Sequence, residues 1–72
     1  MTNTLKLKAA MVARGLTQAD LARLLNLSEQ TMNYKINNRR EFKASEIQML
    51  ISVLQIPSDQ VDGIFFVPDV DS

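Results

Sequence analysis

The sequence lacks cysteine, histidine and tryptophan, and only 6% of its residues are aromatic. Without cysteine the chain can form neither a disulfide nor a thiolate metal site. Without histidine it lacks the commonest general base and the commonest metal ligand. Serine–histidine chemistry, cysteine–histidine chemistry and zinc binding are therefore excluded. Since no nucleophile–base pair or glycine-rich loop is recognisable either, we expect no catalytic residue, metal, cofactor or small-molecule substrate.

Long hydrophobic runs are absent as well. The first 15 residues interleave apolar side chains with Lys and Arg, so they predict neither a signal peptide nor a membrane span. A chain of 72 residues forms one domain at most. We expect a single soluble domain without a membrane partner, and its lack of cysteine suits the reducing cytoplasm.

The formal net charge is zero, but the charges are unevenly distributed along the chain. Residues 1–43 carry a net charge of +5, whereas residues 44–72 contain five acidic residues and no basic one. Such a chain can meet phosphate groups with one face and still stay soluble. An ordinary mixed surface is the alternative interpretation.

Hydrophobic spacing of three to four residues predicts an all-α fold of four to five helices within residues 1–66. Because helices this short are marginal in water, they must share one core. Residues 67–72 are acidic and lack periodicity, so we expect a disordered tail. The expected helices cover residues 4–14, 17–25 and 28–37, then a stretch from about residue 43 that Pro57 stops, and a short stretch that opens at Ser58.

Residues with special backbone roles mark the ends of the first three helices. Gly15 and Asn26 tolerate positive φ and fit the turns that follow a helix. Leu16 is expected to fold back onto the core. The N-cap candidates are Asn3 or Thr4 for the first helix, Thr17 for the second and Ser28 for the third.

The helical period also predicts which residues face the core. Phe42 resembles the apolar residue of a hydrophobic staple that packs on Ile47, and Glu46 is placed to accept from the amide of residue 43. The residues expected to face inward are Leu5, Ala9, Ala10, Met11 and Val12, then Leu21, Leu25, Met32 and Ile36, then Ile47, Leu50, Ile51 and Leu54, and finally Val61, Ile64 and Phe65.

The opposite side of residues 28–37 is expected to carry only amides and one carboxylate, those of Glu29, Gln30, Asn33 and Asn37. Gln and Asn can make paired hydrogen bonds to adenine in the major groove of DNA, and Glu can accept from cytosine. Exposed helix faces are polar in any case, so this pattern alone does not establish DNA binding. The residues on either side of this helix supply further evidence.

Polar and basic residues bracket that helix on both sides. Through side chains or helix-terminal amides, these residues can contact backbone phosphates. Tyr34 and Lys35 either extend these contacts or are a half-buried tyrosine and a solvated lysine stem. The candidates for phosphate contact are Thr17, Gln18, Ser28, Arg39 and Arg40.

The run from Leu16 to Ile56 resembles the Cro and phage-repressor class of helix-turn-helix domains. The later positions are similar to the small phage-switch branch of that class. The residues that carry the resemblance are Thr17-Gln18, Leu21-Ala22, Leu27-Ser28 and Lys35-Ile36-Asn37, followed by Phe42, Glu46-Ile47, Leu54 and Ile64-Phe65-Phe66.

This resemblance implies a lambda-repressor-like domain in which residues 28–37 form the recognition helix. Two positions depart from the family pattern. Asn26 stands where the family often has glycine, and Glu29 places an acid at the front of the recognition helix, where it repels phosphate. The resemblance also implies that Gln18 and Ser28 contact phosphates and that Glu29, Gln30 and Asn33 contact bases.

Two functions fit these observations. The first is a transcriptional regulator of a phage lysis–lysogeny switch that binds operator DNA in the bacterial cytoplasm. The second is an antirepressor, similar to small phage proteins called modulators of repression, that binds a partner phage repressor through the same surface. Glu29, the zero net charge and the acidic second half suit a basic protein partner as well as DNA.

The last apolar residues leave homodimerisation open. Ile64 and Phe65 are expected in the core, because a domain this small needs them there. Phe66 and Val67 are expected to be exposed, where they could form a two-fold interface.

Overall fold

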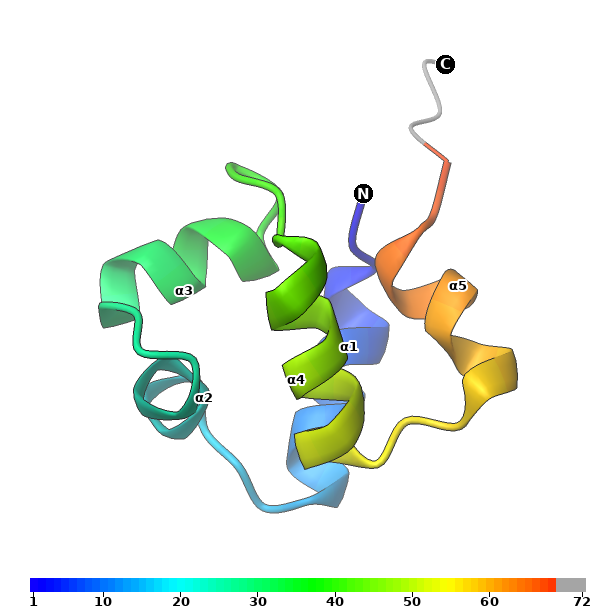
Figure 1. The fold of residues 1–72 in the computed structure, drawn as a ribbon, viewed down its shortest axis with the longest axis horizontal. Helices are drawn as coiled ribbons and strands as arrows, with labels where there is room; N and C mark the ends of the chain where they lie inside the picture. Colours follow the sequence, from blue (N-terminus) through cyan, green and yellow to red (C-terminus); the bar gives the residue numbers. More distant parts are fainter. Residues whose placement is uncertain (69–72) are drawn as a thin grey trace.

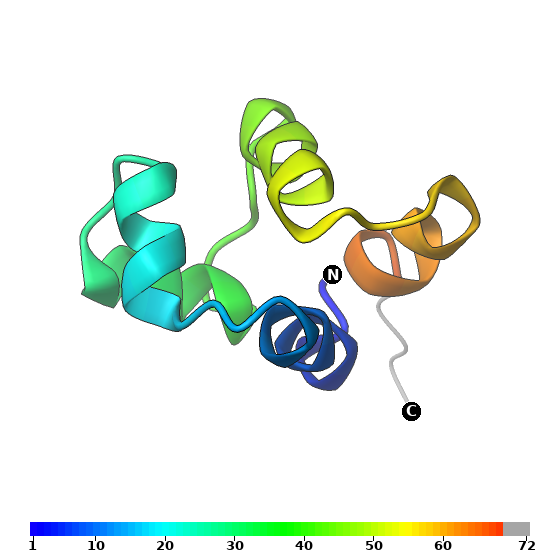
Figure 2. The same ribbon diagram turned by 90° about the horizontal axis from the view of Figure 1, so that it is seen from below.

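Helices alone build the fold in the computed structural model, which describes residues 1–68 and contains no strand in that range. The elements are α1 (Thr4–Ala13), α2 (Gln18–Leu24), α3 (Glu29–Ile36), α4 (Ala44–Leu54), the 3-10 helix η1 (Ser58–Gln60) and α5 (Val61–Phe65). The all-α prediction is confirmed. Figure 1 shows α2 and α3 at one end of the long axis, α5 at the other, and α4 crossing between them. Seen from below, α1 and α4 lie on opposite sides of the molecule (Figure 2).

The first three helices begin and end within one residue of the predicted positions. The side chains of Asn3, Thr17 and Ser28 each accept a hydrogen bond from the amide three residues later, which has no partner within its own helix. Gly15 has a φ of 67° and Asn26 a φ of 57°, so both occupy the left-handed region expected of them. Local signals therefore set these boundaries.

The chain after α4 differs in detail from the prediction. Gln55 adopts the left-handed conformation with a φ of 52° and ends α4 two residues before Pro57. The predicted last helix begins as the 3-10 turn η1. Val67 exchanges two backbone hydrogen bonds with Met1, at 2.9 and 3.0 Å. Residues 69–72 of the expected tail lie outside the described residues.

All five α-helices contribute to one core. Ile64 and Phe65 of α5 are both 4% exposed and close the core as predicted. Fully burying an aliphatic side chain contributes about 1.5 to 3 kcal/mol relative to leaving it in water. The fully buried side chains are Leu7 of α1, Leu21 of α2, Met32 and Ile36 of α3, and Leu50 of α4.

The face that α1 turns to the core agrees only in part with the prediction, because Met11 is buried and Ala10 packs against the core as expected, but Leu5, Ala9 and Val12 are exposed. Leu7 and Met11 are buried, whereas Leu5 is 81% exposed, Val12 is 78% exposed and Ala9 lies with them on the solvent side. Both sets of residues recur at helical spacing, so periodicity alone cannot choose between them.

Anchors outside α1 fix its rotation. The amide of Asn3 donates a hydrogen bond to the carbonyl of Ile64 at 2.7 Å. The hydroxyl of Thr4 donates to the carbonyl of Ile36, also at 2.7 Å. These contacts join the start of α1 to the ends of α5 and α3, and they turn Leu7 inward.

Lys35 is buried, so it is neither an additional phosphate contact nor a solvated lysine stem, the two roles that the sequence suggested. Only 5% of the residue is exposed, and its Nζ donates to Oε1 of Glu46 at 2.5 Å. The same oxygen accepts from the amide of Lys43 at 2.8 Å, which confirms the predicted reach of Glu46 to that amide. Burial raises the pKa of the Glu46 carboxyl, but the hydrogen bonds from Lys35 and Lys43 and their positive charges hold the pKa below its ordinary value.

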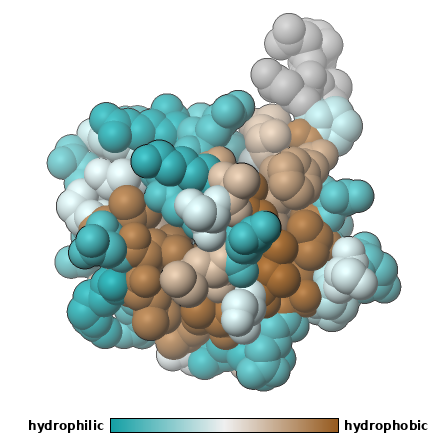
Figure 3. Space-filling view, viewed as in Figure 1, coloured by the Kyte–Doolittle hydropathy of each residue, from teal (hydrophilic) through white to brown (hydrophobic). Residues whose placement is uncertain are grey.

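Part of the apolar surface stays exposed. Hydrophobic side chains gather on both sides of α4, toward α2 and toward α5 (Figure 3). Phe66 is 56% exposed, as predicted. None of the described helices combines the length and apolar character needed to cross a bilayer.

Replacing Leu50 with alanine is expected to destabilise the domain by about 2 to 5 kcal/mol, because the fully buried side chain leaves a cavity. The matched control is Leu5→Ala, where an 81% exposed side chain is lost and the change should stay within about 0.5 kcal/mol. Urea denaturation followed by circular dichroism measures both free energies of unfolding. Equal losses in the two variants would contradict the assigned faces.

Glu46→Gln is expected to cost about 3 kcal/mol at neutral pH, because it leaves the buried ammonium of Lys35 without a countercharge. The pKa of Glu46 is lowered in the folded state, so its contribution is full above the unfolded pKa and is lost as pH falls through the folded pKa. Denaturation curves below about pH 4 should therefore show a smaller loss of stability with acid in the variant than in the natural chain. Identical pH dependence in both would disprove the role of this pair.

Candidate functional site on the outward face of α3

A four-residue turn, residues 25–28, joins α2 to α3 and fixes how the two helices cross. Asn26 takes up the left-handed conformation in this turn. The amide of Leu27 then donates to the carbonyl of Ala22 at 2.8 Å, and the Leu27 side chain packs against the core. The turn therefore holds the start of α3 beside α2.

The polar residues predicted on the outward side of α3 do lie there. Glu29, Gln30, Asn33 and Asn37 are all exposed, whereas Met32 is fully buried. The helical period thus separates a core side from a side made of amides and one carboxylate. Ser28, also exposed, caps the front of this face.

Gln18 links the start of α2 to this face. Its Nε2 donates to the carbonyl of Glu29 at 3.3 Å, and its Oε1 accepts from Nδ2 of Asn33 at 3.2 Å. Nδ2 of Asn37 donates to the carbonyl of Asn33 at 3.0 Å. A side-chain amide has two N–H donors and one carbonyl acceptor. Within the described part of the chain, Asn33 therefore keeps one donor and its acceptor for an outside partner.

Tyr34 and the two arginines after α3 form a second cluster. The hydroxyl of the half-buried Tyr34 accepts from Nε2 of Gln30 at 2.8 Å. The guanidinium carbons of Arg39 and Arg40 each lie 5.7 Å from the centre of the Tyr34 ring, within the range of cation–π attraction. The ring thus positions two positive charges at the end of α3.

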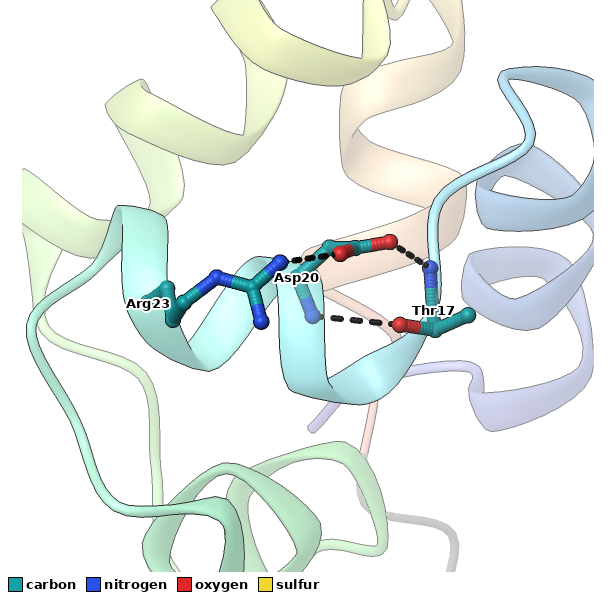
Figure 4. Close-up of polar contacts among 3 residues, drawn as sticks. All are labelled: Thr17, Asp20 and Arg23. Atoms are coloured by element: carbon teal, nitrogen blue, oxygen red, sulfur yellow. Dashed lines mark hydrogen bonds and ion pairs between the residues drawn. The ribbon is translucent and has the colours of Figure 1, made fainter.

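Thr17 and Asp20 form a capping box at the start of α2 (Figure 4). The amide of Asp20 donates to the Thr17 hydroxyl at 3.1 Å, and the amide of Thr17 donates to the Asp20 carboxylate at 2.9 Å. Hydrogen bonding to Thr17 and the charge of Arg23 hold the pKa of Asp20 below its ordinary value. Thr17 is therefore engaged in holding the first turn of α2, where Gln18 lies.

The net positive charge near this face is smaller than the net charge of +5 for residues 1–43 indicates. Arg23 and Lys35 both form ion pairs with acidic residues of the chain. Between residues 17 and 40, the charged side chains outside any ion pair are Arg39, Arg40 and Glu29. The face thus presents two positive charges and one negative one.

Asn38 is a positioning residue that the sequence analysis missed. It has a φ of 65°, its Oδ1 accepts from the amide of Thr2 at 2.7 Å, and its Nδ2 donates to the carbonyl of Thr2 at 2.8 Å. This pair of bonds ties the loop that carries Arg39 and Arg40 to the N-terminal segment. The only sign of this role in the sequence is an asparagine in a predicted loop, because its partner Thr2 lies 36 residues away.

Thr17→Ala is expected to destabilise the domain by about 1 kcal/mol, because the first turn of α2 loses its cap. The pKa of Asp20 should rise only in part, because the hydrogen bond to the Thr17 side chain is lost while the backbone amide at position 17 still donates to the carboxylate; a carboxyl-detected NMR titration measures this. Thr17→Ser keeps the hydroxyl and serves as the matched control. An unchanged free energy of unfolding in the alanine variant would rule out a stabilising role for the Thr17 hydroxyl, whose bond from the Asp20 amide is the part of the capping box that alanine removes.

The part of the chain that matches a known family includes every candidate site residue from Thr17 to Arg40. A family model described as "Protein of unknown function (DUF739)" matches residues 3–68, which span α1 to α5 and the whole outward face of α3. No curated protein matches the chain. The chain therefore belongs to the DUF739 family, whose function is unknown.

Proposed function

We propose that this protein is a transcriptional regulator that binds operator DNA with α3 in the major groove. The observation that carries the proposal is the outward face of α3, where the amides of Gln30, Asn33 and Asn37 are each held by one internal hydrogen bond. Each amide keeps its remaining donor and its acceptor for a base edge, and adenine accepts this paired pattern in the major groove. Glu29 can accept from the amino group of cytosine.

The internal bonds also lower the cost of binding. Ordering a free side chain at an interface costs about 0.5 to 1.5 kcal/mol. Gln18 already orients Asn33, and Tyr34 already orients Gln30, so much of that cost is met within the folded chain. The second N–H of the Gln18 amide group is available to a backbone phosphate while its oxygen still holds Asn33.

Arg39 and Arg40 supply the electrostatic contacts of this proposal. Neither forms an ion pair within the described residues, and both are placed by Tyr34 at the end of α3. Phosphate contacts of this kind fix the register of a protein on DNA and make its affinity fall with salt. The role in a temperate-phage switch rests on the resemblance to Cro and phage-repressor domains.

A second candidate function is that of an antirepressor, which binds a partner phage repressor through the same face of α3. The charge balance favours it, because Glu29 and only two unpaired arginines give little attraction for a polyanion. The DNA-reading surface of a repressor is basic, so it would attract Glu29 rather than repel it.

Gln30→Ala and Asn33→Ala are each expected to weaken DNA binding by about 1 to 3 kcal/mol without unfolding the domain, because each removes a base-reading amide. Fluorescence anisotropy with DNA that flanks the gene measures the binding, and thermal denaturation checks the fold. Val12→Ala, on α1, is the control and should leave both unchanged. A loss of helicity equal to that of Leu50→Ala would show that these residues face the core instead.

A salt titration separates the two functions. If the chain reads DNA, its affinity alone should fall steeply as the salt concentration rises. If it is an antirepressor, it should show no DNA affinity alone, and it should release the neighbouring repressor from that DNA. Gln30→Ala should weaken whichever activity is found, because both use the same face.

A further inference from the structure

The outer side of α1 carries an apolar stripe that the fold leaves uncovered. Leu5 is 81% exposed and Val12 is 78% exposed, more than any other large hydrophobic residue in the described part of the chain. Ala9, which is also exposed, lies between them in the sequence. Residues spaced by four and then three positions share one side of a helix. These three residues therefore form a single stripe, named here the α1 stripe.

The α1 stripe lies opposite the side of the helix that packs into the core. Leu7 and Met11 fill the core from the inner side, and the helical period puts the stripe on the outer side. In Figure 2, α1 lies at the edge of the molecule, and no other helix of residues 1–68 lies beyond it. Single exposed hydrophobic residues are common on protein surfaces, but a helix that is apolar on two opposite sides is typical of one that is covered on both.

Positive charge borders the α1 stripe. The helical period puts Lys8 on one side of the stripe and Lys6 on the other, and both lysines are exposed. Lys6 lines an open groove together with Asp59 of η1, which offsets part of its charge. Lys8 forms no ion pair within residues 1–68, and α1 itself contains no acidic residue. Whatever covers the stripe therefore meets positive charge, chiefly that of Lys8.

We propose that the α1 stripe binds an acidic amphipathic helix of a different protein. Helices that dock through one side do so with apolar residues three, four and seven positions apart, which is the spacing found in the stripe. Acidic residues at the edge of the partner's apolar side would meet the two lysines. A basic partner helix would place like charges against them, so the lysines select the sign of the partner's charge.

Other occupants fit this surface less well. In a two-fold contact between copies of this chain each surface meets itself, so lysines would face lysines. A DNA backbone would attract the lysines but would gain nothing from an apolar centre between them. An anionic membrane would gain little, because the stripe offers only three apolar residues on a 10-residue helix, and one of them is alanine. The stripe contains no residue of the outward face of α3, so the proposal does not rest on the proposed function.

Selection from a displayed library of random peptides of about 15 residues, long enough to form a helix, tests the proposal. The immobilised natural chain should enrich peptides that are acidic and that have apolar residues at helical spacing. The most enriched peptide is then synthesised and titrated into the isotope-labelled natural chain, where it should shift the NMR signals of α1 most. Enrichment of basic or uncharged peptides would overturn the proposal, as would shifts confined to other helices.

Matched variants show whether the stripe and its charge carry the binding. Leu5→Ser should weaken binding of the selected peptide at least about tenfold, because an exposed apolar anchor is lost. Met49→Ser, which removes a 45% exposed side chain from α4, is the control and should bind normally. Lys8→Gln should weaken binding and reduce its dependence on salt, whereas Arg39→Gln, the same charge change at the end of α3, should not. Circular dichroism confirms that the four variants fold. Equal effects within either pair would overturn the proposal.

Two further measurements address the other occupants. Self-association of the natural chain that Leu5→Ser abolishes would assign the α1 stripe to a second copy, and sedimentation equilibrium measures it. Binding to phosphatidylglycerol vesicles that Leu5→Ser abolishes would assign the stripe to a membrane. Either result would overturn the proposal. Peptide binding is measured without DNA or a repressor, so this inference can fail while the proposed function of α3 stands, and the reverse also holds.

Discussion

The buried ion pair between Lys35 and Glu46 governs how α3 is presented. Lys35 lies on the core side of α3 with Met32 and Ile36, and its bond to Glu46 ties that side of the helix to α4. In this orientation of α3, Asn33 and its neighbours face solvent while Met32 fills the core. A buried ion pair adds little net stability compared with apolar packing, but an unpaired buried charge is costly. The pair therefore specifies one orientation of the helix more than it stabilises the fold.

Most of the fold could be predicted because its signals are local. The caps at Thr17 and Ser28 and the left-handed residue Asn26 act within a few residues of themselves, so the sequence shows them directly. The rotation of α1 could not be predicted, because Leu5 and Leu7 both belong to apolar sets with helical spacing. The choice between them depends on bonds from the start of α1 to residues 36 and 64, which are distant in the sequence.

The same distinction applies to the candidate site. The outward residues of α3 follow from the helical period, and the structure places them as expected. Their mutual bonds do not follow from it, because the contact of Gln18 with Asn33 requires the crossing of two helices. The burial of Lys35 could not be predicted either, since its partner Glu46 is 11 residues away on another helix. The charge of a site therefore cannot be counted from the sequence before the ion pairs are known.

This correction to the charge bears on how a neutral chain could bind DNA. One copy offers Arg39 and Arg40 as the unpaired positive charges near α3, and Glu29 opposes them. The electrostatic part of DNA affinity grows with the number of phosphates that are neutralised. A chain with a formal net charge of zero and only two unpaired arginines near α3 therefore has little electrostatic attraction for DNA, so its base-reading amides would have to supply more of any DNA affinity.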